Sequence, residues 1–190
     1  MNPPGGRAPV AVFLDRDGVL NRVVVRAGKP YPPGSVGEIE IPPDVGPALA
    51  RLKTAGFRLV VVTNQPDVAR GRQRRAVVEA INADLAARLP LDEFRVCYHD
   101  DGDGCLCRKP QPGLLLAPPT YHIARSVMVG DRWRDVEAGR RAGVRATVMI
   151  GDGYNEALPT EPDYRAGTLE EAARWILGLD APDRGTRVAS

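Results

Sequence analysis

Two aspartates two residues apart follow an apolar run near the start of this 190-residue chain. The run covers residues 10–14, and the acids are Asp15 and Asp17, with Gly18 directly after them. A carboxylate can attack phosphorus and form an aspartyl-phosphate, but a divalent cation is needed to offset its repulsion from an anionic phosphate. Asp15 is the candidate nucleophile. Asp17 is placed to protonate the leaving alkoxide and later to deprotonate the attacking water. Taken alone, the tetrapeptide also fits a polar turn after a strand.

A second apolar run, residues 58–62, ends in a hydroxyl and two amides: Thr63, Asn64 and Gln65. Hydroxyl and main-chain N–H groups at the carboxyl end of a strand can bind phosphate oxygens, and open α/β sheets bind their ligands at that edge. We therefore expect these three residues to contact the phosphate or the rest of the substrate.

Two later segments add cations and further acids. Arg108 and Lys109 bring two positive charges that are expected to bind the substrate, with Lys109 holding oxygens of the reacting phosphate. A third apolar run leads to Asp131, with Asp135 in the following segment. Mg²⁺ prefers an octahedral oxygen shell with few protein ligands. We expect a catalytic Mg²⁺ bound by three acids: Asp15, Asp17 through its carbonyl, and Asp131. Asp135 is expected to orient this shell from behind.

The three cysteines and one of the two histidines lie close together in the sequence. They form two pairs, Cys97 with His99 and Cys105 with Cys107, separated by a loop that can fold back. Four such ligands suit a tetrahedral Zn²⁺, and a site with no position left for water is structural. Free thiols, or one disulfide with an odd cysteine, are the alternatives. Because neither a signal peptide nor a transmembrane run is evident, we expect a cytoplasmic protein, where paired thiols more often bind metal.

Four segments, in this order, resemble the four motifs of the haloacid dehalogenase superfamily: Asp15-x-Asp17, Thr63, Lys109, and Gly130-Asp131-x-x-x-Asp135. The resemblance extends over roughly residues 10 to 150. It implies a Rossmann-like parallel sheet, Mg²⁺ and an aspartyl-phosphate intermediate. An aspartate at position 17 is typical of the phosphatases and phosphotransferases of this superfamily.

The cysteine segment narrows the resemblance, because Cys107 is followed directly by Arg108 and Lys109. This arrangement is similar to the zinc-containing, capless branch that includes heptose bisphosphate and histidinol-phosphate phosphatases. Segments 63–65, 69–71 and 108–113 look closer to the heptose enzymes, whereas the short zinc loop also occurs in the histidinol enzymes. The resemblance therefore implies a phosphorylated sugar as substrate, a heptose 1,7-bisphosphate cleaved at C7, with histidinol phosphate as the alternative. Arg108 is expected to contact the distal phosphate or the sugar hydroxyls.

Length and composition fit one α/β domain, since 43% of the residues are hydrophobic. The segments between the motifs leave no room for a large cap domain, so loops must shape the pocket, namely residues 26–31 and the zinc loop 97–107. We expect residues 10–180 to form a single phosphatase domain. Residues 1–9 and 181–190 are expected to be disordered because of their proline, glycine and polar content.

Hydrophobic periodicity predicts alternating strands and helices, and therefore a parallel sheet flanked by helices. Strands are expected near residues 10–14, 58–63, 94–98, 126–129 and 145–150. Helices are expected near residues 45–55, 73–89, 133–142 and 169–177. Thr168 and Glu171 have the spacing of a capping box before the last helix.

A formal net charge of +2 is too small to indicate nucleic-acid binding, but residues 70–75 form a local basic run. Such a run is ordinarily a solvated helix start. Arg70 or Arg72 could instead bind a second substrate phosphate, or the run could bind DNA as in polynucleotide 3′-phosphatases, which share the fold; the lack of an aromatic platform disfavours DNA. We expect a monomer without a membrane partner. A non-catalytic binding protein of the same fold is the remaining alternative, and the complete set of acids with Lys109 argues against it.

Overall fold

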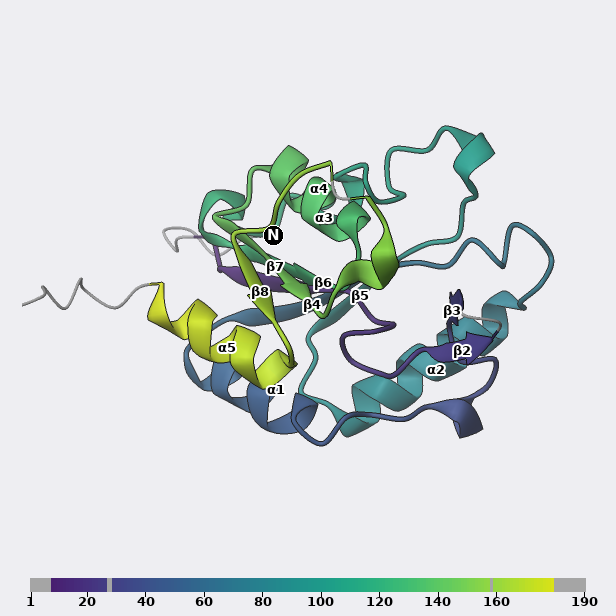
Figure 1. The fold of residues 1–190 in the computed structure, drawn as a ribbon, viewed down its shortest axis with the longest axis horizontal. Helices are drawn as coiled ribbons and strands as arrows, with labels where there is room; N and C mark the ends of the chain where they lie inside the picture. The colour runs from purple at the N-terminus through teal and green to yellow at the C-terminus, as the bar shows by residue number, and fades with distance from the viewer. Residues whose placement is uncertain (1–7, 27–28, 158, 180–190) are drawn as a thin grey trace, which may run out of the picture.

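The computed structural model describes residues 8–26, 29–157 and 159–179. Its centre is a six-stranded sheet in the order β5-β4-β1-β6-β7-β8, and every pair of neighbouring strands is parallel (Figure 1). The strands are β1 Ala11–Leu14, β4 Arg58–Asn64, β5 Glu93–Cys97, β6 Val127–Gly130, β7 Ala146–Ile150 and β8 Tyr164–Ala166. The predicted Rossmann-like parallel sheet is confirmed.

Helices cover both faces of the sheet. In Figure 1 one face carries α1 (Val45–Thr54), α2 (Arg75–Arg88) and α5 (Leu169–Gly178). The opposite face carries α3 (Gly113–Leu116) and α4 (Trp133–Ala142). Four 3₁₀ turns complete the described elements: η1 Val36–Glu38, η2 Asp101–Asp103, η3 Ile123–Arg125 and η4 Gly153–Asn155. The four longer helices that the sequence predicts are present, with ends that differ by one or two residues.

The central strand β1 shows why the sequence pattern predicts this sheet. Val12 and Leu14 pack in the core shared with α1 and α5, whereas Ala11 and Phe13 pack in the core shared with α3 and α4. All four side chains have no exposed surface. A parallel strand buried on both faces is encoded as a continuous apolar run, so its end can be located from the first polar residue after it.

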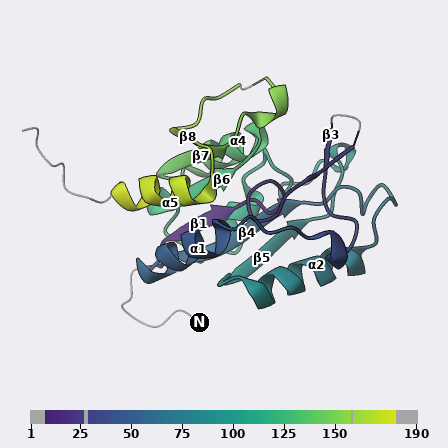
Figure 2. The same ribbon diagram turned by 60° about the horizontal axis from the view of Figure 1, so that its bottom comes forward.

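A short antiparallel hairpin, β2 (Val24–Arg26) and β3 (Lys29–Tyr31), lies beyond the carboxyl edge of the sheet (Figure 2). The sequence predicts a loop wall from residues 26–31; residues 27–28 lie outside the described residues, and the hairpin itself is not predicted. The expected disordered ends fall mainly on residues 1–7 and 180–190, which also lie outside the described part. Within that part, no helix combines the length and apolar character needed to cross a membrane.

The edge strand β8 is a further element that the sequence does not predict. It has three residues and pairs with β7, beside which Asp163 is anchored. The Asp163 Oδ2 accepts hydrogen bonds from the Thr147 main-chain N–H at 2.7 Å and from Thr147 Oγ1 at 3.0 Å, while Oδ1 pairs with Arg140 at 2.7 Å. The contacts of this one carboxylate with residues distant in the sequence thus hold a strand that is too short to be recognised from its own pattern.

The last helix is capped in a modified way. The Thr168 hydroxyl accepts from the Glu171 main-chain N–H at 3.2 Å, as a capping box requires. The Glu171 carboxylate bonds the main-chain N–H of Gly167 at 2.9 Å, one residue earlier than the box places it. The predicted cap therefore provides acceptors for two main-chain N–H groups, but the second is that of Gly167 and not that of Thr168.

The strand order brings the sequence motifs together. The chain runs outward from β1 through β4 to β5, returns to β6 on the other side of β1, and continues to β8. In such open sheets the ligand site lies at the carboxyl ends of the strands where the order reverses. Asp15 follows β1 and Asp131 follows β6, so the two acids flank this reversal point.

We predict that Asp163→Asn lowers the free energy of unfolding at pH 7 by about 1–2 kcal/mol, because a neutral amide replaces the charged carboxylate that bonds Thr147 and Arg140. Burial alone raises the pKa of Asp163, but these bonds hold it below its usual value. The charged form therefore contributes stability above the ordinary aspartate pKa, and this contribution is lost as the pH falls. Urea unfolding should show a wild-type advantage at pH 7 that narrows at pH 3; an equal gap at both values would contradict this role.

Candidate active site and cysteine cluster

Three carboxylates converge on one lysine at the carboxyl edge of the sheet. Asp15, Asp131 and Asp135 each offer an oxygen within 4.8 Å of the others. The Lys109 ammonium, 2% exposed, lies 2.9 Å from Asp15 Oδ1 and 2.6 Å from Asp135 Oδ1. It also donates to the Val62 carbonyl at 2.7 Å, so all three of its protons have acceptors. The structure thus brings together four of the residues that the sequence singles out.

Burial disfavours the charged forms of Asp15, Asp131 and Lys109. It raises the pKa of Asp15 to about 7 even though Lys109 lowers it. Burial, together with repulsion from Asp15 and Asp135, raises the pKa of Asp131 well above its usual value. Burial alone would lower the pKa of Lys109, but the carboxylates of Asp135 and Asp15 raise it above its usual value. Three ionised acids and one ammonium leave two negative charges, which a divalent cation can neutralise.

The remaining oxygen atoms fit such a cation. Asp131 Oδ1 is buried and has no hydrogen-bond partner among the described residues, whereas Oδ2 accepts from the Tyr154 hydroxyl at 2.7 Å. Asp135 uses Oδ1 for Lys109 and Oδ2 for the main-chain N–H of Arg132 at 3.0 Å. Asp131 therefore has an oxygen free for a metal, and Asp135 is occupied with holding Lys109. An oxygen-only donor set of this kind suits Mg²⁺.

The Asp17 carboxylate lies in a hydrogen-bond network of its own. Arg16 donates to both of its oxygens, from Nε at 3.2 Å and from an Nη at 2.9 Å. Asn21 donates to Oδ1 at 3.0 Å, and Gln65 donates to Oδ2 at 2.8 Å. Arg16 has no exposed surface and is anchored in turn by Asn82 of α2 at 2.9 Å. The sequence analysis missed Arg16, although an arginine between two acids at the end of a buried strand was a signal.

Besides Lys109, two side chains predicted to contact substrate are engaged within the protein. Gln65 also donates to the Thr63 hydroxyl at 3.0 Å and so connects Thr63 with Asp17. Asn64 accepts from the Lys109 main-chain N–H and donates to the Lys109 carbonyl, both at 3.0 Å. Its amide therefore fastens the Lys109 backbone to the end of β4. Because its side-chain amide is engaged in this way, a contact between Asn64 and the substrate would have to come from its main chain.

A cavity of about 520 Å³ opens over these residues at the carboxyl edge. Acidic residues and the predicted phosphate-binding residues line it together with five arginines: Arg70, Arg72, Arg108, Arg132 and Arg134. Tyr31, at the end of the predicted wall 26–31, lines the cavity together with Pro32 and Tyr154, whereas none of its described lining residues comes from the predicted zinc-loop wall 97–107. The acids are suited to hold a metal ion that binds one anionic group, and the arginines are suited to bind further negative charge on the same ligand.

The basic run is largely paired within the protein. Arg70 binds Asp100 through two nitrogens, one of them at 2.8 Å. Arg75 pairs with Glu79 at 2.7 Å and lies over the Tyr98 ring. Arg70 nevertheless lines the cavity, which leaves the second-phosphate interpretation of this run compatible with the geometry.

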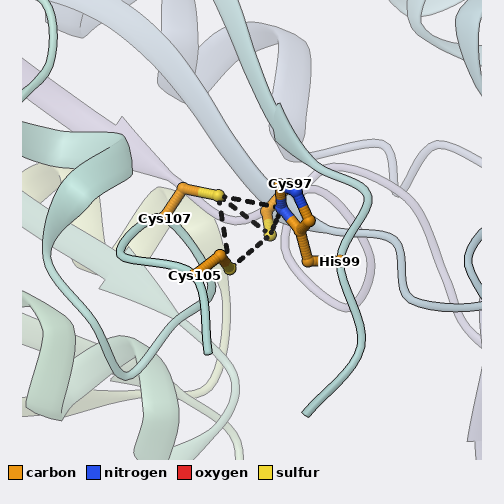
Figure 3. A group of neighbouring side chains, drawn as sticks. All are labelled: Cys97, His99, Cys105 and Cys107. Carbon is orange, nitrogen blue, oxygen red and sulfur yellow. Dashed lines mark hydrogen bonds between the residues drawn. The ribbon is translucent and has the colours of Figure 1, made fainter. Parts of the chain in front are cut away.

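The four predicted zinc ligands converge on one point (Figure 3). The sulfur–sulfur distances are 3.2 Å for Cys97 to Cys107, 3.5 Å for Cys105 to Cys107 and 3.7 Å for Cys97 to Cys105. His99 Nδ1 lies 3.6 Å from the Cys97 sulfur and 3.3 Å from the Cys107 sulfur. Sulfurs bound to one tetrahedral Zn²⁺ are separated by about 3.8 Å, given Zn–S bonds of about 2.3 Å. No disulfide joins the three cysteines, and the four donors form a set that could hold zinc.

Comparison with known proteins agrees with this geometry. A family model described as "HAD-hyrolase-like" matches residues 106–172. The D-glycero-beta-D-manno-heptose-1,7-bisphosphate 7-phosphatase of Escherichia coli (strain K12) is 37% identical over 182 residues, which cover 88% of this chain and 87% of the relative. The chain belongs to this family of haloacid dehalogenase-like phosphatases. The superfamily resemblance read from the four motifs is therefore confirmed.

Two further relatives of this phosphatase bear on metal and substrate. The D-glycero-alpha-D-manno-heptose-1,7-bisphosphate 7-phosphatase of Photorhabdus laumondii is 31% identical, covering 86% of this chain and 94% of the relative. The crystal structure of D,D-heptose 1,7-bisphosphate phosphatase from B. bronchiseptica, complexed with magnesium and phosphate, superposes with a TM-score of 0.76 at 30% identity, covering 90% of this chain and 99% of that one. A close structural relative thus holds Mg²⁺, as the donor set here suggests.

We predict that Lys109→Met lowers the free energy of unfolding by about 3–5 kcal/mol in Mg²⁺-free buffer, because it leaves buried carboxylates without their cation. Lys53→Met is the matched control: Lys53 pairs with Asp92 at 2.6 Å near the surface, and its loss should cost about 1 kcal/mol or less. Urea unfolding of both variants measures the difference. Equal small losses would show that Lys109 does not balance the buried acids.

Proposed function

We propose that this phosphatase uses Mg²⁺ to remove the C7 phosphate of D-glycero-D-manno-heptose 1,7-bisphosphate. The observation that carries the proposal is that carboxylate oxygens of Asp15 and Asp131 lie within 4.8 Å of each other at an arginine-lined cavity, and that Asp131 Oδ1 is buried without a donor among the described residues. The identity of the sugar is inferred from the names of the relatives, which include both the beta and the alpha anomer. The anomers differ at C1, so the chemistry at C7 is common to both.

The proposed Mg²⁺ ligands are oxygens of three acids: Asp15, Asp131 and the Asp17 carbonyl. When bound, Mg²⁺ offsets the repulsion between Asp15 and the phosphate and stabilises the charge that develops on phosphorus. Asp135 is not needed as a direct ligand, since both of its oxygens are engaged. Its role in the proposal is to hold Lys109 against Asp15.

Asp15 attacks the phosphorus and forms an aspartyl-phosphate, which water then hydrolyses. Its Oδ1 is fixed by Lys109 at 2.9 Å and by the Arg16 main-chain N–H at 2.8 Å, so the carboxylate is oriented before the substrate binds. Asp17 gives a proton to the leaving C7 oxygen and takes one from the attacking water. It reaches the substrate by exchanging one of its present donors, and we propose Gln65, which also bonds Thr63 at the end of β4, as that donor.

Arg108 is the proposed contact for the distal C1 phosphate. Its side chain is largely buried, lines the cavity, and donates from Nε to Asp101 Oδ1 at 2.9 Å. A second donation to the His99 carbonyl, at 3.4 Å, attaches it to the cysteine segment. A guanidinium fixed in this way can bind a phosphate with two parallel hydrogen bonds.

We further propose that Zn²⁺ bound by Cys97, His99, Cys105 and Cys107 is structural. The four protein donors leave no place for a reacting water. Because Arg108 and Lys109 follow Cys107 in the chain, folding the loop around zinc fixes both cations at the site. The loop would then act on catalysis only through the placement of these two residues.

We predict that Cys107→Ser loses bound zinc and has a lower melting temperature, because one of the four ligands is weakened and the loop is no longer held. Leu106→Ser is the control, since Leu106 is 79% exposed in the same loop. Zinc content by elemental analysis and thermal unfolding are measured on both. A zinc-free wild type, or a Cys107→Ser protein that keeps its stability, would refute the structural role.

The substrate is tested by phosphate release from a panel with saturating Mg²⁺: both heptose 1,7-bisphosphate anomers, histidinol phosphate, fructose 1,6-bisphosphate and a 3′-phosphorylated oligonucleotide. We expect the highest kcat/KM on a heptose bisphosphate. Asp15→Asn is the blank, and removing the nucleophile should lower turnover by roughly four orders of magnitude or more without loss of folding.

Two outcomes of this panel would contradict different parts of the proposal. Preference for histidinol phosphate or the oligonucleotide would replace the substrate and leave the chemistry intact. Full activity of Asp15→Asn would refute the aspartyl-phosphate mechanism itself.

A further inference from the structure

The loop between β7 and β8 carries an unusual backbone over the metal side of the cavity. Gly151 and Gly153 have φ of 69°, and Tyr154 has φ of 56°, the one positive value of a non-glycine residue in the described chain. A tyrosine in the left-handed region is disfavoured and persists where surrounding contacts fix it. Those contacts are therefore informative about the role of this loop.

Two side-chain contacts of the loop lead to the fourth motif. The Tyr154 hydroxyl donates to Asp131 Oδ2 at 2.7 Å. Two residues later, Glu156 accepts from Arg132 Nε at 3.1 Å. The loop is thus tied to two consecutive residues, Asp131 and Arg132, at the end of β6.

The turn after the first motif also comes close to the Asp131 carboxylate. A Cβ atom on Gly18 would lie 1.8 Å from Asp131 Oδ2 and 3.1 Å from the Tyr154 hydroxyl oxygen. Gly18 and Tyr154 therefore pack around the same oxygen, and neither leaves room for the carboxylate to turn. With Oδ2 fixed, Oδ1 remains as a buried atom that no described residue pairs with.

We propose that Tyr154 is a positioning residue for the Mg²⁺ site. Its hydroxyl fixes Asp131 Oδ2, so that Oδ1 is presented to the cation, and its ring closes the metal side of a cavity that has no cap domain. This inference rests on the Mg²⁺ site of the proposed function. Tyr154 does not contact the reacting atoms; it acts through Asp131, as groups behind a metal ligand commonly do.

The arrangement distinguishes this role from simple packing. The Tyr154 residue is 39% exposed, so its ring is not part of the hydrophobic core. Removing only the hydroxyl leaves the ring and the loop tether from Glu156 in place. The expected effect of that change falls on the metal and not on folding.

The test is Mg²⁺ binding to Tyr154→Phe by isothermal titration calorimetry, with the zinc-loaded protein and without substrate. Loss of the bond should weaken Mg²⁺ binding by about tenfold, the lower end of what such changes cost. Phosphate release from a simple aryl phosphate should then require about tenfold more Mg²⁺ for half-maximal rate, and recover at saturating Mg²⁺. Tyr164→Phe is the control, because Tyr164 donates to Glu171 at 2.8 Å away from the site; its Mg²⁺ affinity should equal that of the wild type.

Unchanged Mg²⁺ affinity in Tyr154→Phe would overturn the inference, whatever its turnover. A rate that stays low at saturating Mg²⁺ would also overturn it, because the hydroxyl would then act on a step other than metal binding. Absence of Mg²⁺ binding by the wild type would refute the metal site itself and the inference with it. The wild-type titration alone detects that failure, so the two cases are separated.

Discussion

Three buried carboxylates and a single buried ammonium lie together at the carboxyl edge of the sheet. The rest of the site has to accommodate the negative charge that this leaves unbalanced. Like charges that are removed from water repel strongly, which is why burial and repulsion raise the pKa of Asp131. Each acid is held by a different element, and Lys109 compensates for only part of the charge. In the proposed account, a divalent cation completes the balance and allows an anionic substrate to bind at a site that would otherwise repel it.

The cysteine cluster and the catalytic edge are linked through a short piece of chain. Cys107 precedes Arg108 and Lys109 directly, and the Asn64 amide fastens the Lys109 backbone to the end of β4 through two bonds of 3.0 Å. Without this support, fixing the lysine between two carboxylates would also require ordering of the backbone that carries it, at a further cost in conformational entropy. In the proposed account, zinc removes part of that cost by folding the loop before substrate binds.

The sequence was sufficient for the parts encoded by local pattern. Strands buried on both faces appear as apolar runs, and the acids directly after them could be assigned to one edge of the sheet before any geometry was known. It was insufficient where a distant contact decides. Strand β8 depends on Asp163 reaching Thr147, Arg16 depends on Asn82 of α2, and Tyr154 meets Asp131 only because the β7–β8 loop returns over the site. The expected roles of Asn64 and Gln65 were also altered by tertiary partners, which take up side-chain amides that looked free for substrate.

The central claim is that Asp15, set among buried acids with Lys109 and Mg²⁺, becomes covalently phosphorylated. Its most direct test is borohydride trapping during turnover, which reduces an aspartyl-phosphate to homoserine, followed by peptide mass spectrometry. The account predicts conversion at Asp15 that requires both Mg²⁺ and substrate. Conversion at another carboxylate, or turnover with no trapped residue under conditions that trap a known aspartyl-phosphate enzyme, would contradict it.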